Sequence, residues 1–280
     1  MRRVKKGRAA VLLLLLLAIR FCPAEESLVF GAIATVKPEI VREHFRPLLE
    51  YLSRELGREV RFATGRDYDD TIARFLDGTF DFGYIGPSPY ILATRRDPGA
   101  LRVIAGIESH GRPTFRAAIV TRRGSPVNSL EDLRGRSFAF GSRRSTLSYY
   151  LPYYMLYIRG ILGTLRHYDL LGRHDIVAKN VIMGLYDAGG IKESVARTYA
   201  GYLKTIAQSE PVTDFAIVVH RSMDPALVEK IRRILLDLDD PRILQAIKKE
   251  MSGFGPRTDR DYDRLREIMK IVDHHAGYSD

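Results

Sequence analysis

The sequence has no tryptophan and one cysteine, Cys22, and it contains neither an internal repeat nor a low-complexity segment. Such a chain has no disulfide framework and, beyond Cys22, no thiol for catalysis or metal binding. Its longest apolar run, residues 9–19, has 11 residues, whereas a helix needs about 20 to span a bilayer. With 280 residues, 45% of them apolar, the chain is long enough for one large or two medium domains, which excludes a disordered or fibrous protein.

Acidic residues are absent from the first 24 positions, which instead carry six basic residues around the apolar run. The small residues Cys22 and Ala24 follow, and this order predicts a secretory signal peptide, residues 1–24, cut after Ala24. A lipoprotein is the alternative, but Arg20 and Phe21 suit the positions before a lipidated cysteine poorly. Without this segment 38 basic residues face 34 acidic ones, so the net charge falls from +10 to +4 and nucleic acid is not an expected partner.

The rest of the chain alternates short apolar runs with helical patterns, and a second unit begins near Pro126. This alternation predicts an α/β fold of two lobes, each a mixed, mostly parallel sheet flanked by helices. Residues 117–121 and 216–220 are the expected crossing strands of a hinge, because the chain has no flexible linker. A cleft between two such lobes is a common place for a small ligand. The main helices are expected at residues 38–56, 69–76, 145–161, 174–183, 193–203, 225–238 and 261–274.

Residues 140–148, Phe-Gly-Ser-Arg-Arg-Ser-Thr-Leu-Ser, indicate the end of a strand, a loop with two arginines and the start of a helix. The first turn of a helix has free backbone N–H groups and a partial positive charge, which suit it to an oxyanion. Ser145 and Thr146 would add hydroxyl donors, and Arg143 or Arg144 would add charge. The alternative is an ordinary serine cap. The five tyrosines between 149 and 157 are expected to form a packed face of that helix.

Five short motifs occur in an order that resembles the substrate-binding proteins of phosphate, phosphite and phosphonate ABC transporters. They are Asp67-Tyr68, residues 81–90, residues 129–135, Ser145-Thr146 and His174-Asp175. The resemblance covers essentially the whole chain after residue 24 and implies the type 2 periplasmic-binding-protein fold. We expect one lobe to consist of residues 25–118 and 218–280, and the other of residues 119–217.

The resemblance also implies a ligand site. In that family a Ser-Thr-Ser run at a helix start holds the phosphonate oxygens; here Ser145 and Thr146 match, but Leu147 stands at the third hydroxyl position. Ser148 or an arginine would have to replace the lost donor. Tyrosines from the other lobe close over the ligand, and acidic and imidazole groups contact an aminoalkyl tail. The ligand-binding residues implied in this way are Tyr68, Tyr84, Ser145, Thr146, His174, Glu193 and Asp214.

The expected function is therefore the capture of a phosphonate, phosphite or phosphate oxyanion between the lobes and its delivery to an ABC transporter permease. We expect a monomeric, extracytoplasmic or periplasmic protein without cofactor, metal or catalytic residues. One alternative is a ligand-sensing partner of a membrane receptor kinase, built on the same fold. Another is an enzyme on this fold, but adjacent residues such as His174 and Asp175 rarely form a base–orienter pair, and no Gly-x-Ser-x-Gly turn is present.

Overall fold

The computed structural model describes residues 26–33 and 37–277. The predicted signal peptide and Cys22 lie outside these residues. Within them, no helix is both long enough and apolar enough to cross a membrane.

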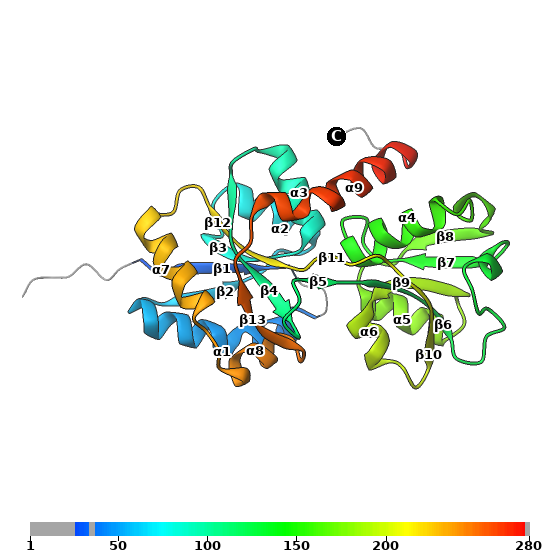
Figure 1. Ribbon diagram of the computed structural model, residues 1–280, viewed down its shortest axis with the longest axis horizontal. Coiled ribbons are helices and arrows are strands. Elements are labelled where there is room, and N and C mark those ends of the chain that lie inside the picture. Colours follow the sequence, from blue (N-terminus) through cyan, green and yellow to red (C-terminus); the bar gives the residue numbers. More distant parts are fainter. Residues whose placement is uncertain (1–25, 34–36, 278–280) are drawn as a thin grey trace, which may run out of the picture.

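The described residues form two α/β lobes that lie side by side (Figure 1). Lobe 1 is built on a six-stranded sheet with helices on both faces. Its strands, in sheet order, are β13 (Met251–Gly255), β4 (Leu101–Ser109), β12 (Ala216–His220), β3 (Phe82–Ile85), β1 (Leu28–Ala32) and β2 (Val60–Ala63). Its helices are α1 (Pro38–Leu56), α2 (Tyr68–Leu76), α3 (Pro87–Arg96), α7 (Pro225–Leu236), α8 (Pro241–Ile247) and α9 (Asp263–His275).

Lobe 2 is built on a five-stranded sheet. Its strands, in sheet order, are β10 (Leu203–Gln208), β6 (Ala117–Arg122), β9 (Ala188–Lys192), β7 (Ser137–Phe140) and β8 (His167–Leu170). Its helices are α4 (Leu151–Tyr157), α5 (His174–Ile182) and α6 (Glu193–Thr198). The helix expected over residues 193–203 is thus wrong in its second half, where the chain turns at residues 199–202 into the edge strand β10.

Both sheets are mixed, as expected, but they contain fewer parallel pairs than expected. Strand β1 runs parallel to β2 and β3, and β7 runs parallel to β8 and β9. The other neighbours, on the side where the chain passes between the lobes, are antiparallel. Four of these five antiparallel pairs involve β6 or β12, the two strands that enter their sheets from the other lobe and run opposite to their neighbours.

The chain passes between the lobes through two short strands, β5 (Thr114–Phe115) and β11 (Val212–Thr213), which pair antiparallel (Figure 1). The sequence prediction placed the crossing at residues 117–121 and 216–220, and this is wrong. Those long, fully buried runs are the interior strands β6 and β12. The crossing strands precede them and have only two residues each, too few to show a strand pattern.

The helices and strands of lobe 1 form where the sequence has amphipathic or continuous apolar runs that can be buried. Helix α1 buries a stripe at Val41, Phe45, Leu48, Leu49, Leu52 and Leu56 against the sheet, and Gly57 ends it in the left-handed conformation. Strand β3 is buried on both faces, as its continuous apolar run predicts. It lies so close to β1 that a Cβ on Gly83 would overlap the carbonyl oxygen of Gly31. The close packing of the buried sheet in lobe 1 therefore fixes the positions of the strand ends after which α2 and α3 begin.

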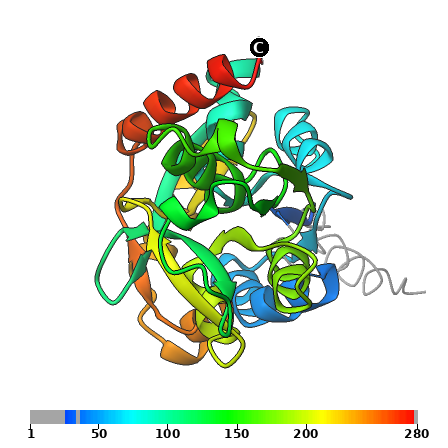
Figure 2. The ribbon, with the colours of Figure 1, turned by 90° about the vertical axis from the view of Figure 1, so that its right-hand side faces the viewer.

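Helix α9 belongs to the chain that returns to lobe 1, but it reaches across to lobe 2 (Figures 1 and 2). Asp273 accepts a hydrogen bond from Arg95 of α3 at 2.8 Å and another from the Tyr150 hydroxyl at 3.1 Å. The Tyr153 hydroxyl lies 2.8 Å from Nδ1 of His275. Tyr149, Tyr150 and Tyr153 are at most 2% exposed, which confirms the predicted packed face for these three tyrosines. Tyr154 is half-buried and Tyr157 is exposed, so the prediction is wrong for the end of the segment.

Candidate functional site

A small cavity of about 40 Å³ lies between the lobes, where strand ends and helix starts from both sheets meet. Hydroxyl, imidazole and ammonium groups line one part of it, and apolar side chains line the rest. The lining residues are Ile33, Tyr68, Gly86, Pro89, Phe115, Ser145, Thr146, Leu147, His174, Lys192, Val195 and Phe215. Four of the residues expected in the ligand site, Tyr68, Ser145, Thr146 and His174, are therefore brought together.

Ser145 caps the helical segment that follows β7. Its backbone is extended, and its Oγ accepts a hydrogen bond from the backbone N–H of Ser148 at 3.1 Å. The first turn, Thr146–Tyr150, is a π-helix, in which the backbone N–H groups of Tyr149 and Tyr150 both donate to the carbonyl of Ser145, at 3.2 and 3.1 Å. The helix expected over residues 145–161 therefore begins with a widened turn and continues as α4. Such π-turns are frequent at functional sites.

His174, the first residue of α5, is buried and holds Ser145 from the other side. Its Nδ1 accepts a hydrogen bond from the backbone N–H of Lys192 at 3.0 Å, so the ring proton sits on Nε2. Nε2 lies 3.2 Å from Ser145 Oγ and donates to it. Burial, and next the positive charge of Lys192, lower the pKa of His174 to about 3. The imidazole is therefore neutral, with a fixed tautomer, at physiological pH.

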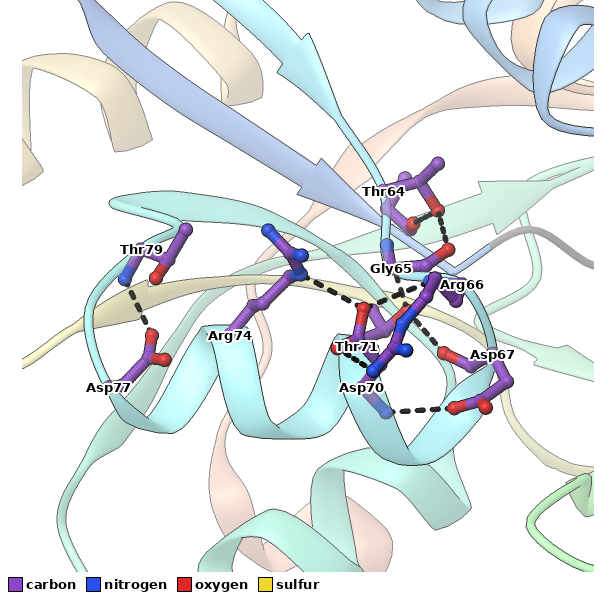
Figure 3. A network of polar contacts seen from close by, with 10 residues as sticks. Thr64, Gly65, Arg66, Asp67, Asp70, Thr71, Arg74, Asp77 and Thr79 are labelled. Atoms are coloured by element: carbon purple, nitrogen blue, oxygen red, sulfur yellow. Dashed lines mark hydrogen bonds and ion pairs between the residues drawn. The ribbon is translucent and has the colours of Figure 1, made fainter.

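Tyr68 reaches the cavity from lobe 1 because it begins α2, whose start is held by a network of polar contacts (Figure 3). Asp67 caps the helix by accepting the backbone N–H of Asp70 at 2.9 Å, and Thr71 Oγ1 accepts the N–H of Gly65 at 3.2 Å. Burial raises the pKa of Tyr68 to about 12, although a side-chain hydrogen bond with Ser145 opposes this rise. Tyr68 thus keeps its hydroxyl proton and contacts Ser145 across the gap between the lobes.

A second contact between the lobes involves Ser88, near the start of α3. Its backbone N–H donates to Thr146 Oγ1 at 3.0 Å, and its Oγ donates to the carbonyl of Arg144 at 2.7 Å. At the rim of the gap, Asp69 accepts a hydrogen bond from Nε of Arg144 at 3.1 Å. The lobes are therefore closed on each other at the Ser-Thr end of the cavity. Ser88 lies within the motif at residues 81–90, but the sequence analysis did not identify it as a contact between the lobes.

Three of the expected ligand residues lie outside the cavity lining. Tyr84 stacks on Phe215, with ring centroids 4.4 Å apart, and lines a neighbouring hollow. Asp214 is fully buried in an ion pair of 2.6 Å with Lys248, and its other oxygen accepts the backbone N–H of Phe215 at 2.8 Å. Glu193 pairs with Arg197 at 3.5 Å. Both carboxylates are therefore engaged by cations of the chain itself.

Leu147, at the position of the third hydroxyl in the related proteins, turns its side chain toward the cavity and is 3% exposed. Ser148, one of the residues expected to replace that donor, instead donates its hydroxyl to the carbonyl of Gly190. The other suggested replacement is an arginine, and of Arg143 and Arg144 the second is held at the rim by Asp69. The cavity thus has an apolar wall where a third hydroxyl was expected.

Lys192 is the main residue that sequence reasoning missed. It ends β9, and its Nζ lies 5.7 Å from the ring centre of Phe115 and 5.3 Å from that of Phe215. Burial, and next the charge of Lys248, lower the pKa of Lys192 to about 8, while Asp214 acts in the opposite direction. A basic residue that ends a buried strand just before a helix is the sequence signal that would have identified it. The cavity thus combines neutral donors with one cation.

The described residues include no group of three or more His, Cys, Asp and Glu side chains that could hold a metal ion. Hydroxyl and imidazole donors together with an ammonium group are instead the chemistry that binds an anion. Nothing in this donor set resembles the ligand set of a structural or catalytic metal.

Two α/β lobes closed on a donor-lined cavity and joined by a pair of crossing strands define a solute-binding protein of the periplasmic-binding-protein class. A model of the family described as "ABC transporter, phosphonate, periplasmic substrate-binding protein" matches residues 30–262. The chain belongs to this family.

Individual relatives agree with this assignment. The phosphate-import protein PhnD of Mycolicibacterium smegmatis is 22% identical, over 88% of this chain and 86% of the relative. The structure of PhnD1 from Prochlorococcus marinus in complex with methylphosphonate is similar with a TM-score of 0.81 and 20% identity, over 88% of this chain and 98% of that one. A binding protein component of an ABC phosphonate transporter from Pseudomonas aeruginosa gives a TM-score of 0.79 at 20% identity, over 88% and 86% of the two chains.

Proposed function

We propose that this protein captures a small phosphorus oxyanion with an apolar substituent, methylphosphonate or phosphite, in the cavity between its lobes. The observation that carries the proposal is the mixed lining of that cavity, in which the polar groups of Ser145, Thr146 and His174 lie together with apolar side chains that include Leu147 and Phe215. A tetrahedral ion with three oxygens and one P–H or P–CH₃ group matches this division. Phosphate, with four oxygens, would leave one against the apolar wall, where an unpaired polar atom is costly.

The size of the cavity supports a small ligand. A buried water needs roughly 10–15 Å³ of such space, so about 40 Å³ holds on the order of three waters or one small tetrahedral ion. A phosphonate with a longer tail does not fit inside this cavity, so its tail has to extend out of it. The lost third hydroxyl at Leu147 fits the same conclusion, because a less polar ligand needs fewer donors.

The donors suit an anion in their protonation state. Neutral His174 donates its Nε2–H to Ser145 Oγ, so the hydroxyl proton of Ser145 points away from the imidazole. The high pKa of Tyr68 keeps its hydroxyl proton, and Lys192 supplies a positive charge at neutral pH. Hydrogen bonds to an ionised partner are roughly twice as strong as neutral ones, and exclusion of water strengthens them further. A few such contacts suffice for micromolar binding, about −8 kcal/mol.

Binding without turnover is favoured by the direction of the Ser145–His174 hydrogen bond. A serine nucleophile needs a histidine nitrogen that accepts its proton. Here the accepting nitrogen, Nδ1, is engaged by the backbone N–H of Lys192, and Nε2 carries the proton toward Ser145. The pair is arranged to donate to a ligand, and we therefore propose a non-enzymatic role.

In this proposal the protein is exported by its N-terminal segment, acts in the periplasm as a monomer, and presents the closed, ligand-bound form to a membrane permease. The two lobes close about β5 and β11, so the boundaries expected at residues 118/119 and 217/218 move to these two strands. The ligand is small, and nucleic acid is not a partner.

Titration calorimetry of residues 25–280 with methylphosphonate, phosphite, phosphate and sulfate tests the proposal. We expect micromolar or tighter binding of methylphosphonate and phosphite, phosphate at least tenfold weaker, and no heat with sulfate. Absence of binding to all three phosphorus compounds at micromolar protein would overturn the proposed function. Equal binding of phosphate would remove the argument from the apolar wall.

A further inference from the structure

Lys192 lies where the small cavity meets a wider hollow of about 760 Å³ between the lobes. The two spaces share Ile33, Lys192, Val195 and Phe215 in their walls. A ligand whose head group occupies the small cavity and whose tail extends into the hollow must therefore pass the ammonium group of Lys192. At this junction the cation lies beside the rings of Phe115 and Phe215, which are nearly perpendicular to each other.

The hollow beyond Lys192 is itself basic. Its walls include the cations Lys192, Arg197, Lys248 and Lys249, and one carboxylate, Glu250. That carboxylate is paired with Arg197. The two other acidic residues whose charge reaches Lys192 are also engaged, Asp214 by Lys248, and Glu193 by the same Arg197 that pairs with Glu250. An ammonium group that entered this space would meet like charges and carboxylates that already have partners.

We propose that Lys192 is a selectivity residue, which pairs with an anionic ligand and excludes phosphonates whose tail carries an ammonium group. Longer phosphonates then enter with a neutral or a carboxylate tail. This inference rests on the function proposed above and adds to it the class of tail that the site accepts.

Three ligands with short tails of different charge provide the test. In 2-aminoethylphosphonate and n-propylphosphonate the tails have the same shape, but one ends in an ammonium group and the other in a methyl group. Phosphonoacetate ends in a carboxylate. We expect the wild-type protein to bind n-propylphosphonate at least tenfold more tightly than 2-aminoethylphosphonate, and phosphonoacetate at least as tightly as n-propylphosphonate.

Two substitutions assign the effect to this side chain. In K192M, which keeps the length of the chain without its charge, the preference for n-propylphosphonate over 2-aminoethylphosphonate should fall below threefold, and in K192E it should reverse. K270M, on the exposed face of α9, is the matched control and should keep the wild-type order. Thermal unfolding should show K192M at least as stable as the wild type, since the substitution removes a charge from a part-buried place.

Proton uptake gives a second readout that a packing role for Lys192 would not produce. The charged groups that face Lys192 are Lys248, Asp214, Glu250 and Glu193, and His174 stays neutral beside it. Its pKa of about 8 means that the free protein at pH 9 is mostly uncharged at this position. Binding of methylphosphonate should then take up as much as about 0.9 proton per ligand in the wild type and none at this site in K192M.

Each outcome bears on one of the two proposals. If methylphosphonate and phosphite bind but 2-aminoethylphosphonate binds as tightly as n-propylphosphonate, selection by Lys192 is wrong and the proposed function stands. If K192M keeps the tenfold preference, selection by Lys192 is wrong and the proposed function stands. The same conclusion follows if none of the three tailed ligands binds while methylphosphonate does. Failure of every phosphorus ligand, methylphosphonate included, would instead overturn the proposed function.

Discussion

The two lobes contribute different things to the cavity. Lobe 2 supplies Ser145, Thr146 and His174, and the bonds that orient Ser145 and His174 come from lobe 2 itself, from the backbone N–H groups of Ser148 and Lys192. Lobe 1 supplies mostly apolar cover, such as Ile33 and Pro89, together with Tyr68. The donors are thus oriented before the lobes meet, whereas closure mainly excludes water. We infer that the ligand binds first to lobe 2 and that lobe 1 then raises the affinity.

The largest effect that this comparison predicts is loss of binding when the donors of lobe 2 are removed. Each hydrogen bond to a charged ligand contributes about 1.5–3 kcal/mol, so Ser145→Ala with Thr146→Ala should weaken methylphosphonate binding at least 100-fold. Calorimetry measures this loss, and circular dichroism should show an unchanged fold. Thr94→Ala, whose hydroxyl bonds to the carbonyls of Tyr90 and Ile91 in its own helix, is the control. Retained affinity in the double variant would place the site elsewhere.

The fixed, neutral state of His174 predicts a dependence of stability on pH. Burial lowers its native pKa to about 3, whereas the unfolded pKa is about 6.5. The unfolded chain therefore binds more protons below pH 6.5, and the stability present above that pH is lost as the pH falls toward 3. Between pH 7 and pH 5 this residue should remove about 2 kcal/mol from the free energy of unfolding. Urea unfolding at the two pH values measures it.

His174→Gln is the comparison for that measurement, because glutamine keeps a polar side chain without titrating. Its free energy of unfolding should fall less between pH 7 and pH 5 than that of the wild type. Identical losses in the two proteins would contradict a buried, neutral His174.

A smaller effect is expected from lobe 1. Ser88→Ala removes two hydrogen bonds of Ser88 Oγ, the one to the carbonyl of Arg144 and the one with Thr146 Oγ1, each 2.7 Å long. The side chains of Ser145, Thr146 and His174 stay in place. At about 0.5–1 kcal/mol net for each bond, affinity should fall by roughly five- to thirtyfold. Small-angle scattering of the variant without ligand should also give a larger radius of gyration than that of the wild type. A loss as large as that of the double variant would show that Ser88 contacts the ligand, and the comparison of the lobes would then be wrong.

The smallest effect concerns the rim. Asp69 is more than half exposed where it pairs with Arg144 and Arg96, and exposed ion pairs contribute less than about 1 kcal/mol. Asp69→Asn should therefore change the affinity less than threefold at 0.15 M salt, with a larger change at low salt, where screening is weaker. Calorimetry at two salt concentrations tests this. An equal, large effect at both concentrations would assign Asp69 a direct part in binding.

The features that the sequence predicted correctly are those formed by residues close together along the chain. Ser145 and Thr146 were identified because a strand, a short loop and a helix start follow one another there, and the tyrosine face because its residues repeat at helical spacing. Lys192 and Ser88 were missed, since only the pairing of β9 with β7 and the closure of the lobes bring them to the cavity. The ion pair of Asp214 with Lys248, 34 residues away, likewise has no local signal.

The widened turn at Thr146–Tyr150 sets the register between the hydroxyls at its start and the tyrosines that follow it. Deletion of one residue there would restore an ordinary helix and rotate Ser145 and Thr146 by about 100° relative to the aromatic side. The number of residues in this turn therefore affects the site separately from which residues they are. A protein with the same Ser-Thr pair but a different number of residues before its packed tyrosines need not present that pair to the same solute.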